Sequence, residues 1–177
     1  SLRAQFLPAD HVDVEEWEGT RLICHGGLEY VKDSPPDIRR LHLNPRQIEF
    51  DDTMLMAYVL GKSELSLKTL EETELGLDVM RYDELMRRTK LATGKKKVDF
   101  RDALAALPEI AKRYAMDDAA GTLLLERELR RQMEADPPSL SHYETLDKPL
   151  VPVLFDMEDA GILIDQIKLR EVSVELR

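Results

Sequence analysis

Hydrophobic residues along most of this chain recur every three or four positions, the spacing of one face of an α-helix. Two short runs rich in β-type residues come first, Thr20–His25 and Ile48–Phe50. After them the pattern predicts helices over Met54–Leu60, from Ser66, over Tyr82–Arg88, over Phe100–Leu107 and from Pro108 to about Ala135. We therefore expect helices to outnumber strands clearly.

Start and stop signals agree with these helices. Ser66 and Asp99 stand where an N-cap side chain is expected to accept a backbone N–H. Gly61 ends the first helix, and Pro108 suits the first turn of the longest one. Pro137-Pro138 stops that helix, because proline disfavours helical backbone in the residue before it.

The last forty residues predict a further helix from Ser139, with a one-sided apolar stripe. The stripe consists of Leu150, Val151, Val153, Leu154, Met157 and Ala160. Pro149 and Pro152 lie inside this helix and predict a kink or a restart near 149. Gly161 ends it, Ile162–Ile164 reads as a β-like stub, and Asp165 caps a last helix. That helix has no stop signal, and the sequence starts without an initiator Met. We therefore expect both ends of the sequence to be cut from a longer protein.

Composition narrows the class of protein. A chain of 177 residues with 43% hydrophobic residues is one domain, or one domain plus a fragment. The 35 acidic and 25 basic residues give a net charge of −10, which argues against a protein that coats DNA by bulk charge. Cys24 is the only cysteine, so an internal disulfide framework and a multi-cysteine zinc site are excluded. No apolar run approaches the roughly 20 residues that span a membrane.

One candidate constellation lies on the longest predicted helix. Tyr114 and Asp118 are four residues apart and share a helix face, so a phenol lies beside a carboxylate. A carboxylate-bound metal can activate a water that such a phenol orients. Spacing does not choose between Asp117 and Asp118, and Arg113 offers Asp117 a plain i,i+4 salt bridge. A core tyrosine with solvated acids is the structural alternative.

Two other features have both a functional and a structural interpretation. Asp51 and Asp52 follow a strand, where acids hold metals or cap the next helix, and we expect one of them to be the cap. Six cations occur between positions 87 and 97 with no acid among them, ending in Lys95, Lys96 and Lys97. This stretch is either a nucleic-acid contact or a solvated loop.

Four blocks of the sequence, in order, resemble the middle of a family A DNA polymerase of the bacterial DNA polymerase I type. They are Phe50-Asp-Asp-Thr-Met-Leu55, Ser66-Leu-Lys-Thr-Leu70, Arg113-Tyr-Ala-Met-Asp-Asp-Ala-Ala-Gly-Thr122 and the long block from Lys148 to Asp165. The third resembles the Tyr-x-x-x-Asp motif of the 3′–5′ proofreading exonuclease. The fourth is similar to the segment that opens the polymerase domain.

The resemblance implies a fold, a site and a setting. It implies a helix-rich α/β domain of the ribonuclease-H-like 3′–5′ exonuclease fold over 1–138, with an incomplete sheet. Helices that open the polymerase thumb follow over 139–177. Asp118 would bind Mg²⁺ or Mn²⁺ and Tyr114 would position the attacking water, both facing the end of the Ile48–Phe50 strand. The parent would be a monomeric bacterial enzyme of the cytoplasm and nucleoid that acts on DNA and on no membrane.

Two departures from the family imply a depleted metal site. In the second exonuclease motif, Gly27 stands at the family's Asn and Val31 at its Asp, and Asp33 fits only with a two-residue shift. The first motif, Asp-x-Glu on the first strand, is expected upstream of Ser1. A two-metal site needs several carboxylates, and valine offers no ligand. We therefore expect little or no exonuclease activity. The alternatives are a free-standing ribonuclease-D-like exonuclease, against which the 148–165 block argues, and an inactive scaffold that contacts DNA.

Overall fold

The computed structural model describes residues 21–26 and 45–176, and helices dominate these ranges. Strand β1 (Arg21–Cys24) lies parallel to strand β2 (Glu49–Asp52), with Arg21 opposite Glu49 and Cys24 opposite Asp52. Within the described residues these two strands make up the sheet. The expectation of a helix-rich α/β chain with a thin sheet is therefore confirmed for this part of the molecule.

Helices α2 to α6 follow the sheet in chain order. They are α2 (Thr53–Val59), α3 (Leu67–Leu75), α4 (Tyr82–Thr93), α5 (Phe100–Ala106) and α6 (Pro108–Glu134). Ser66 and Asp99 are the predicted N-caps, and Asp99 forms a capping box with Asp102. The predicted end of α4 at Arg88 was too early. Thr89 is buried and the helix continues through it to Thr93. Gly94, with φ 69°, ends the helix.

The C-terminal run begins at Pro137 rather than at Ser139. It consists of α7 (Pro137–His142), the π-helical turn η3 (Tyr143–Asp147) and α8 (Lys148–Ala160), followed by α9 (Gln166–Glu175). The irregularity predicted near 149 is the π-helical turn η3: Asp147 and Lys148 keep helical backbone angles, so α8 continues from η3 without a new start, and Pro149 follows directly. The predicted β-like stub at Ile162–Ile164 was wrong. These side chains are exposed and no described strand pairs with them. Asp165 caps α9 as expected.

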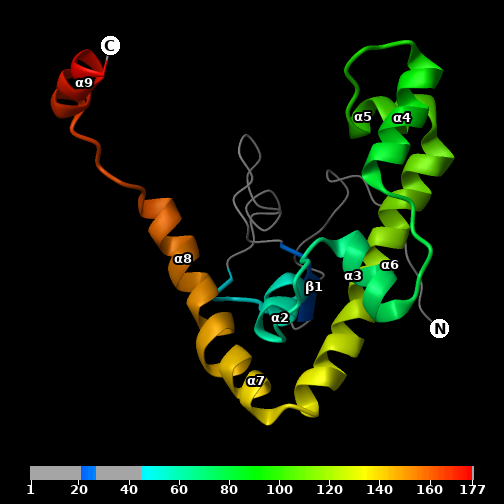
Figure 1. Ribbon diagram of the computed structural model, residues 1–177, viewed down its shortest axis with the longest axis horizontal. Helices are drawn as coiled ribbons and strands as arrows, with labels where there is room; N and C mark the ends of the chain where they lie inside the picture. The colour runs from blue at the N-terminus through cyan, green and yellow to red at the C-terminus, as the bar shows by residue number, and fades with distance from the viewer. Residues whose placement is uncertain (1–20, 27–44, 177) are drawn as a thin grey trace.

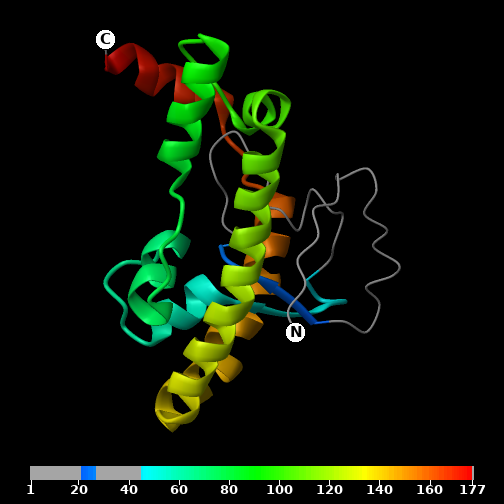
Figure 2. The same ribbon diagram turned by 90° about the vertical axis from the view of Figure 1, so that its right-hand side faces the viewer.

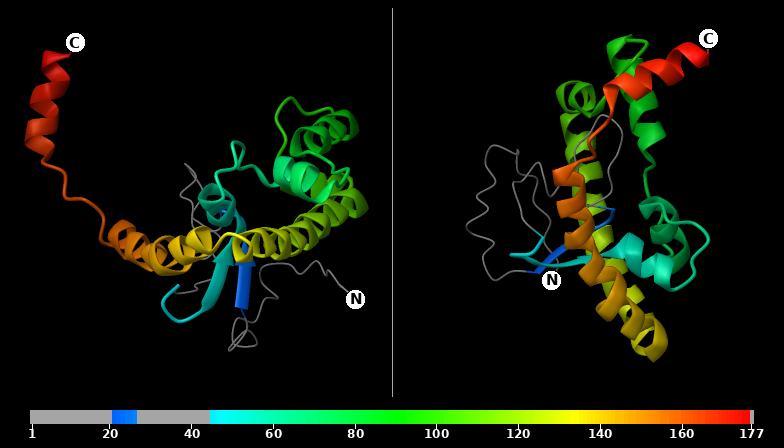
Figure 3. Two further views of the ribbon diagram at one scale, coloured as in Figure 1. Left: turned by 60° about the horizontal axis from the view of Figure 1, so that its bottom comes forward. Right: turned by 90° about the vertical axis from the view of Figure 1, so that its left-hand side faces the viewer.

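The helices are arranged as two arms around the sheet. In Figure 1, α6 and the α7–α8 run form a V, and α2 and the sheet lie between its arms. Helices α4 and α5 pack at the N-terminal end of α6, seen from the side in Figure 2. The left-hand view of Figure 3 shows α9 standing apart from the other helices. The body of the molecule is therefore built on α6, the longest described helix.

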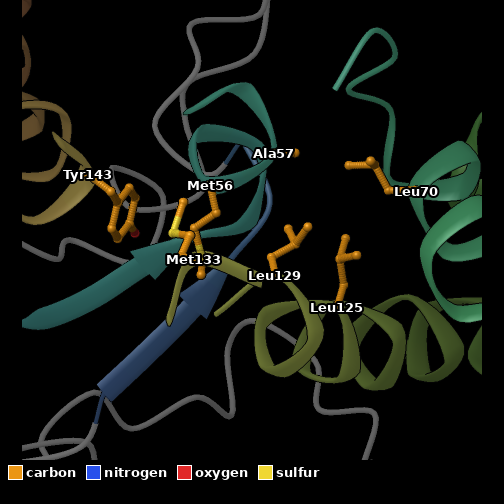
Figure 4. Close-up of a cluster of buried hydrophobic side chains, with 7 residues drawn as sticks. All are labelled: Met56, Ala57, Leu70, Leu125, Leu129, Met133 and Tyr143. Carbon is orange, nitrogen blue, oxygen red and sulfur yellow. The ribbon is translucent and has the colours of Figure 1, made fainter. Parts of the chain in front are cut away.

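The main hydrophobic core lies where the V closes. Leu125, Leu129 and Met133 of α6 point toward Met56 and Ala57 of α2 (Figure 4). Tyr143 closes this cluster from η3 and Leu70 from α3, and all seven side chains are almost completely buried. Burying such aliphatic side chains contributes about 1.5–3 kcal/mol each. The core thus joins α2 and α3 to α6 and to the C-terminal run.

A smaller core lies at the far end of α6. It consists of Leu85, Met86, Ala103 and Ala111, with Phe100 and Tyr114 packed against it. Among the described residues, no helix is both long enough and apolar enough to cross a membrane.

Candidate functional site

The two residues singled out on the longest helix do lie one turn apart on α6, but they face other helices. The Tyr114 ring packs on Tyr82 of α4 and Phe100 of α5, with ring centroids 6.3 and 6.4 Å apart. The Tyr114 hydroxyl lies close enough to the Asp118 carboxylate for each group to affect the pKa of the other. Of the two neighbouring acids, Asp118 is therefore the partner of the tyrosine. Asp117 forms the predicted salt bridge, with Arg113 Nε 2.8 Å from its Oδ2.

A lysine of the neighbouring helix completes this site. The Lys68 ammonium on α3 is ion-paired with Asp118 Oδ1. The same nitrogen lies 2.9 Å from Oε2 of Glu71 and 5.2 Å from the centroid of the Tyr114 ring. A cation over the face of an aromatic ring is attracted to it electrostatically. Lys68 thus contacts both members of the Tyr114–Asp118 pair.

Glu71 lies inside the contact between α3 and α6. It is fully buried, and its carboxylate occupies the space where a side chain at Gly121 would begin. A Cβ at position 121 would lie 1.6 Å from Glu71 Oε1. The glycine therefore lets a buried carboxylate approach the α6 backbone. Beside it, a pocket of about 260 Å³ is lined by Lys68, Glu71, Tyr114 and Asp117, among others.

The electrostatics of the site follow from burial and from this one cation. Burial raises the pKa of Asp118, and the Lys68 contact opposes that shift only in part. Burial likewise raises the pKa of Glu71. Burial disfavours the charged form of Lys68, but its hydrogen bonds to Asp118 and Glu71 outweigh that effect and raise its pKa. The pKa of Tyr114 is raised by burial and by the nearby Asp118 charge, so its hydroxyl stays protonated.

We expected Tyr114 and Asp118 to face the end of the second strand, but among the described residues neither forms an ion pair or a ring contact with that strand. Their described side-chain contacts are with α3, α4 and α5. The sheet lies against a later part of α6, where Glu126 Oε1 is 3.2 Å from Arg21 Nη2 of β1. Eight residues of helix between Asp118 and Glu126 correspond to about 12 Å along the axis. The long helix therefore serves two separate packing regions.

The two acids after the second strand have structural roles. One of the two was expected to cap α2, and it is Asp52, which accepts from Met54 N at 2.9 Å and also from Gly26 N. Asp51 is fully buried among cations, with Arg130 Nη2 2.8 Å and Lys148 Nζ 3.2 Å from its Oδ1. With these carboxylate oxygens already paired, the alternative of a metal site at this pair is not supported.

The basic stretch is exposed and lies apart from the pocket. Lys95 is ion-paired with Asp102 of α5, and Lys96 and Lys97 are exposed. The lysines are not among the residues that line the pocket beside Tyr114.

Several residues of the expected metal site lie outside the described residues. These are Gly27, Val31 and Asp33 of the second motif. Upstream of β1 the sequence does contain an Asp-x-Glu, Asp13-Val14-Glu15, which also lies outside them. Within residues 21–26 and 45–176, no three His, Cys, Asp or Glu side chains are grouped so that they would hold a metal ion.

Sequence reasoning missed Lys68 and Glu71, although a signal was present. Lys68 follows the cap Ser66 in the first turn of α3, where the helix dipole disfavours a cation. Glu71 is three residues further on and within salt-bridge spacing. A lysine at the positive end of a helix, with an acid at i+3, suggests that nearby carboxylates offset the unfavourable interaction between its charge and the helix dipole.

Comparisons with known proteins show which family this part of the chain resembles. Residues 39–134 match the family described as 3′–5′ exonuclease. A DNA polymerase I of Chloroflexus aurantiacus is 40% identical over 125 residues, which is 69% of this chain and 12% of that protein. A DNA polymerase I of Rhizobium leguminosarum is 37% identical over 72% of this chain and 12% of its own length. One of Pseudomonas aeruginosa is 34% identical over 71% and 13%. No solved structure matches the chain.

Proposed function

The chain belongs to the 3′–5′ exonuclease family, and we propose that it is part of a family A DNA polymerase that acts in DNA replication and repair. Relatives named DNA polymerase I align with about 70% of the chain, which supports this proposal. The aligned region spans only 12% of the Chloroflexus protein, so polymerase activity would belong to a much longer polypeptide.

The proposed architecture is a ribonuclease-H-like exonuclease domain over 1–138, followed by the start of the polymerase domain over 139–177. Parallel pairing of β1 with β2 and the helices packed around them are compatible with that fold. The change of direction between α6 and α7, at Asp136 and Pro137, supports a boundary here. Tyr143, beyond it, is buried against α2 and α6, so the second segment begins docked on the first.

We further propose that this domain supports the polymerase and does not proofread. Exonucleases of this family would use Mg²⁺ or Mn²⁺, but the described residues around Asp118 do not fit a divalent ion. The observation that carries the proposal is the ion pair between Asp118 and Lys68, since the carboxylate oxygen needed by a metal is already bound to a fixed cation. No catalytic step through a metal is therefore derived for Tyr114 and Asp118.

DNA is the proposed partner of the whole protein, as a single-stranded 3′ end or a primer–template, with a monomeric parent in the bacterial cytoplasm and nucleoid. The exposed Lys96 and Lys97, with Lys95, are the proposed phosphate contacts on this chain. Because such contacts are purely electrostatic, any binding through them would weaken steeply with salt.

An exonuclease assay tests the absence of proofreading. The 177-residue chain is incubated with end-labelled single-stranded DNA and Mg²⁺ or Mn²⁺, and we expect no shortening. Metal-dependent removal of nucleotides from the 3′ end that is lost in Asp118→Ala would overturn the proposal. Asp117→Ala is the matched control, because Asp117 is the neighbouring acid and is paired with Arg113 on the helix surface. If activity is found, Asp13→Ala tests whether the upstream Asp-x-Glu contributes.

A further inference from the structure

We propose that the Lys68 ammonium is a resident cation of this site, which turns Tyr114, Asp118 and Glu71 into a metal-independent clamp between α3 and α6. The inference rests on the proposed function only in treating the site as non-catalytic. It assigns to Lys68 the place beside Asp118 that a divalent ion would occupy in a working exonuclease.

Three contacts converge on the lysine nitrogen. It is ion-paired with Asp118 Oδ1, lies 2.9 Å from Glu71 Oε2 and lies over the Tyr114 ring at 5.2 Å from its centroid. Two of these partners come from α6 and one from α3 itself. The side chain is mostly buried, with 12% of its surface exposed. Contacts of this kind are screened little by solvent, unlike those of a surface salt bridge.

The position of Lys68 in its helix is unfavourable for a positive charge, so the charge needs nearby carboxylates. It is the second residue of α3, after Leu67, and the first turn of this helix holds no acidic residue. The positive end of the helix dipole repels a cation there. Burial adds to the cost of the charge. Attraction to Asp118 and Glu71 offsets both effects, so the charged state of Lys68 depends on the packing of α3 against α6.

The charges of the cluster leave little room for a metal ion. Glu71 and Asp118 share one cation, while the neighbouring Asp117 is neutralised separately by Arg113. A divalent ion at Asp118 would lie close to the Lys68 ammonium, and like charges at such distances repel strongly in a partly buried site. Metal binding at Asp118 would therefore require Lys68 to leave its place between Asp118 and Glu71.

A double-mutant cycle on the 177-residue chain tests the clamp. The melting temperature is measured for wild type, Lys68→Met, Asp118→Asn and the double variant, each with and without MnCl2. We expect Lys68→Met to lower the melting temperature by roughly 5 °C. The double variant should lose clearly less than the sum of the two single losses, because each single change removes the same interaction. MnCl2 should not raise the melting temperature of the wild type.

Lys168→Met is the matched control. Lys168 pairs with Glu171 at the same i,i+3 spacing and the same 2.9 Å as Lys68 with Glu71, but both side chains are largely exposed. Its melting temperature should stay within about one degree of wild type, since surface pairs contribute little.

Two results would overturn the proposal. Additive losses would mean that Lys68 and Asp118 are not coupled. A Mn²⁺-dependent rise in the melting temperature of the wild type, lost in Asp118→Asn, would mean that the metal and not the lysine is the partner of Asp118. If Lys68→Met does not fold, this wild-type titration decides the matter by itself: no rise supports the resident cation, and a rise lost in Asp118→Asn overturns it. Nuclease activity with the coupling intact would sink the proposed function and leave the clamp standing.

Discussion

At the scale of single residues, the contact between Glu71 and Gly121 fixes how closely α3 and α6 approach. The carboxylate is fully buried and lies against the glycine backbone, at the place where any larger residue would put its Cβ. Glycine in a helix interior normally costs about 1 kcal/mol relative to alanine. Here that cost leaves room for the Glu71 carboxylate against α6, while its other oxygen, Oε2, lies 2.9 Å from Lys68 Nζ of the same helix.

Replacing Gly121 with alanine should therefore destabilise the chain in spite of the better helix propensity. The new Cβ would lie 1.6 Å from Glu71 Oε1 and 2.7 Å from Glu71 Cδ, so the buried side chain must move. Overpacking of this kind costs typically 1–3 kcal/mol, which exceeds the propensity gain. Urea unfolding at neutral pH measures the change. Glu71→Ala added to Gly121→Ala should restore most of the loss, with Glu71→Ala alone as the control. A Gly121→Ala chain more stable than wild type would contradict the close contact.

At the scale of elements, the π-helical turn η3 ties the C-terminal run to the sheet. Its first residue, Tyr143, is fully buried in the main core. The Tyr143 hydroxyl donates to Asp51 Oδ1 at 2.9 Å and accepts from Asp52 N at 3.2 Å. Burial, with the Asp51 charge nearby, raises the pKa of this tyrosine, so the hydroxyl remains a donor. The run that begins at Pro137 is thus anchored on β2 through this phenol and through Lys148, whose Nζ lies 3.2 Å from Asp51 Oδ1.

Tyr143→Phe tests this anchor with little change in volume. The Asp52 N–H would lose its acceptor, and an unsatisfied buried polar group costs about 1–3 kcal/mol. We expect the free energy of unfolding to fall by that amount, measured by urea unfolding. Tyr58→Phe is the matched control, because Tyr58 on α2 is largely exposed. Equal effects of the two changes would show that the hydroxyl of Tyr143 contributes nothing to the docking of η3.

At the scale of the whole molecule, the far end of the C-terminal run is uncovered. Val151 of α8 is buried, but the rest of the predicted stripe is not: Leu150, Val153, Leu154 and Met157 are between 42% and 63% exposed. The exposed apolar residues continue through Ile162–Ile164 and α9. Soluble monomers seldom leave contiguous apolar patches of this kind open. In the proposed polymerase, the remaining domain would cover them.

For the 177-residue chain we therefore predict loose structure or self-association through residues 153–176. Hydrogen exchange should be fast there and slow across α6 and η3, because few buried contacts hold the end of the run. Leu154→Glu with Met157→Glu should reduce self-association in sedimentation experiments without lowering the melting temperature. The prediction would be contradicted if a strictly monomeric sample showed the same protection from hydrogen exchange over 153–176 as over α6. This segment would then be packed on the rest of the chain.

The sequence by itself determined the elements and the family. Caps at Ser66, Asp99 and Asp165, a cap at one of Asp51 and Asp52, and the limits of α6 could be predicted, because local hydrogen bonding and backbone preference decide them. The motif blocks indicated the family, which the comparisons confirm. The stub at Ile162–Ile164 was predicted wrongly, because a strand needs a partner and β propensity does not supply one.

Only the tertiary structure decided what Tyr114 and Asp118 contact. Their helical spacing was readable from the sequence, but a helix face has no partner until another element packs on it. The packing of α3 brought Lys68 and Glu71 to that face, from more than forty residues away. Charge and burial at the site are properties of that contact between helices, which no local pattern contains.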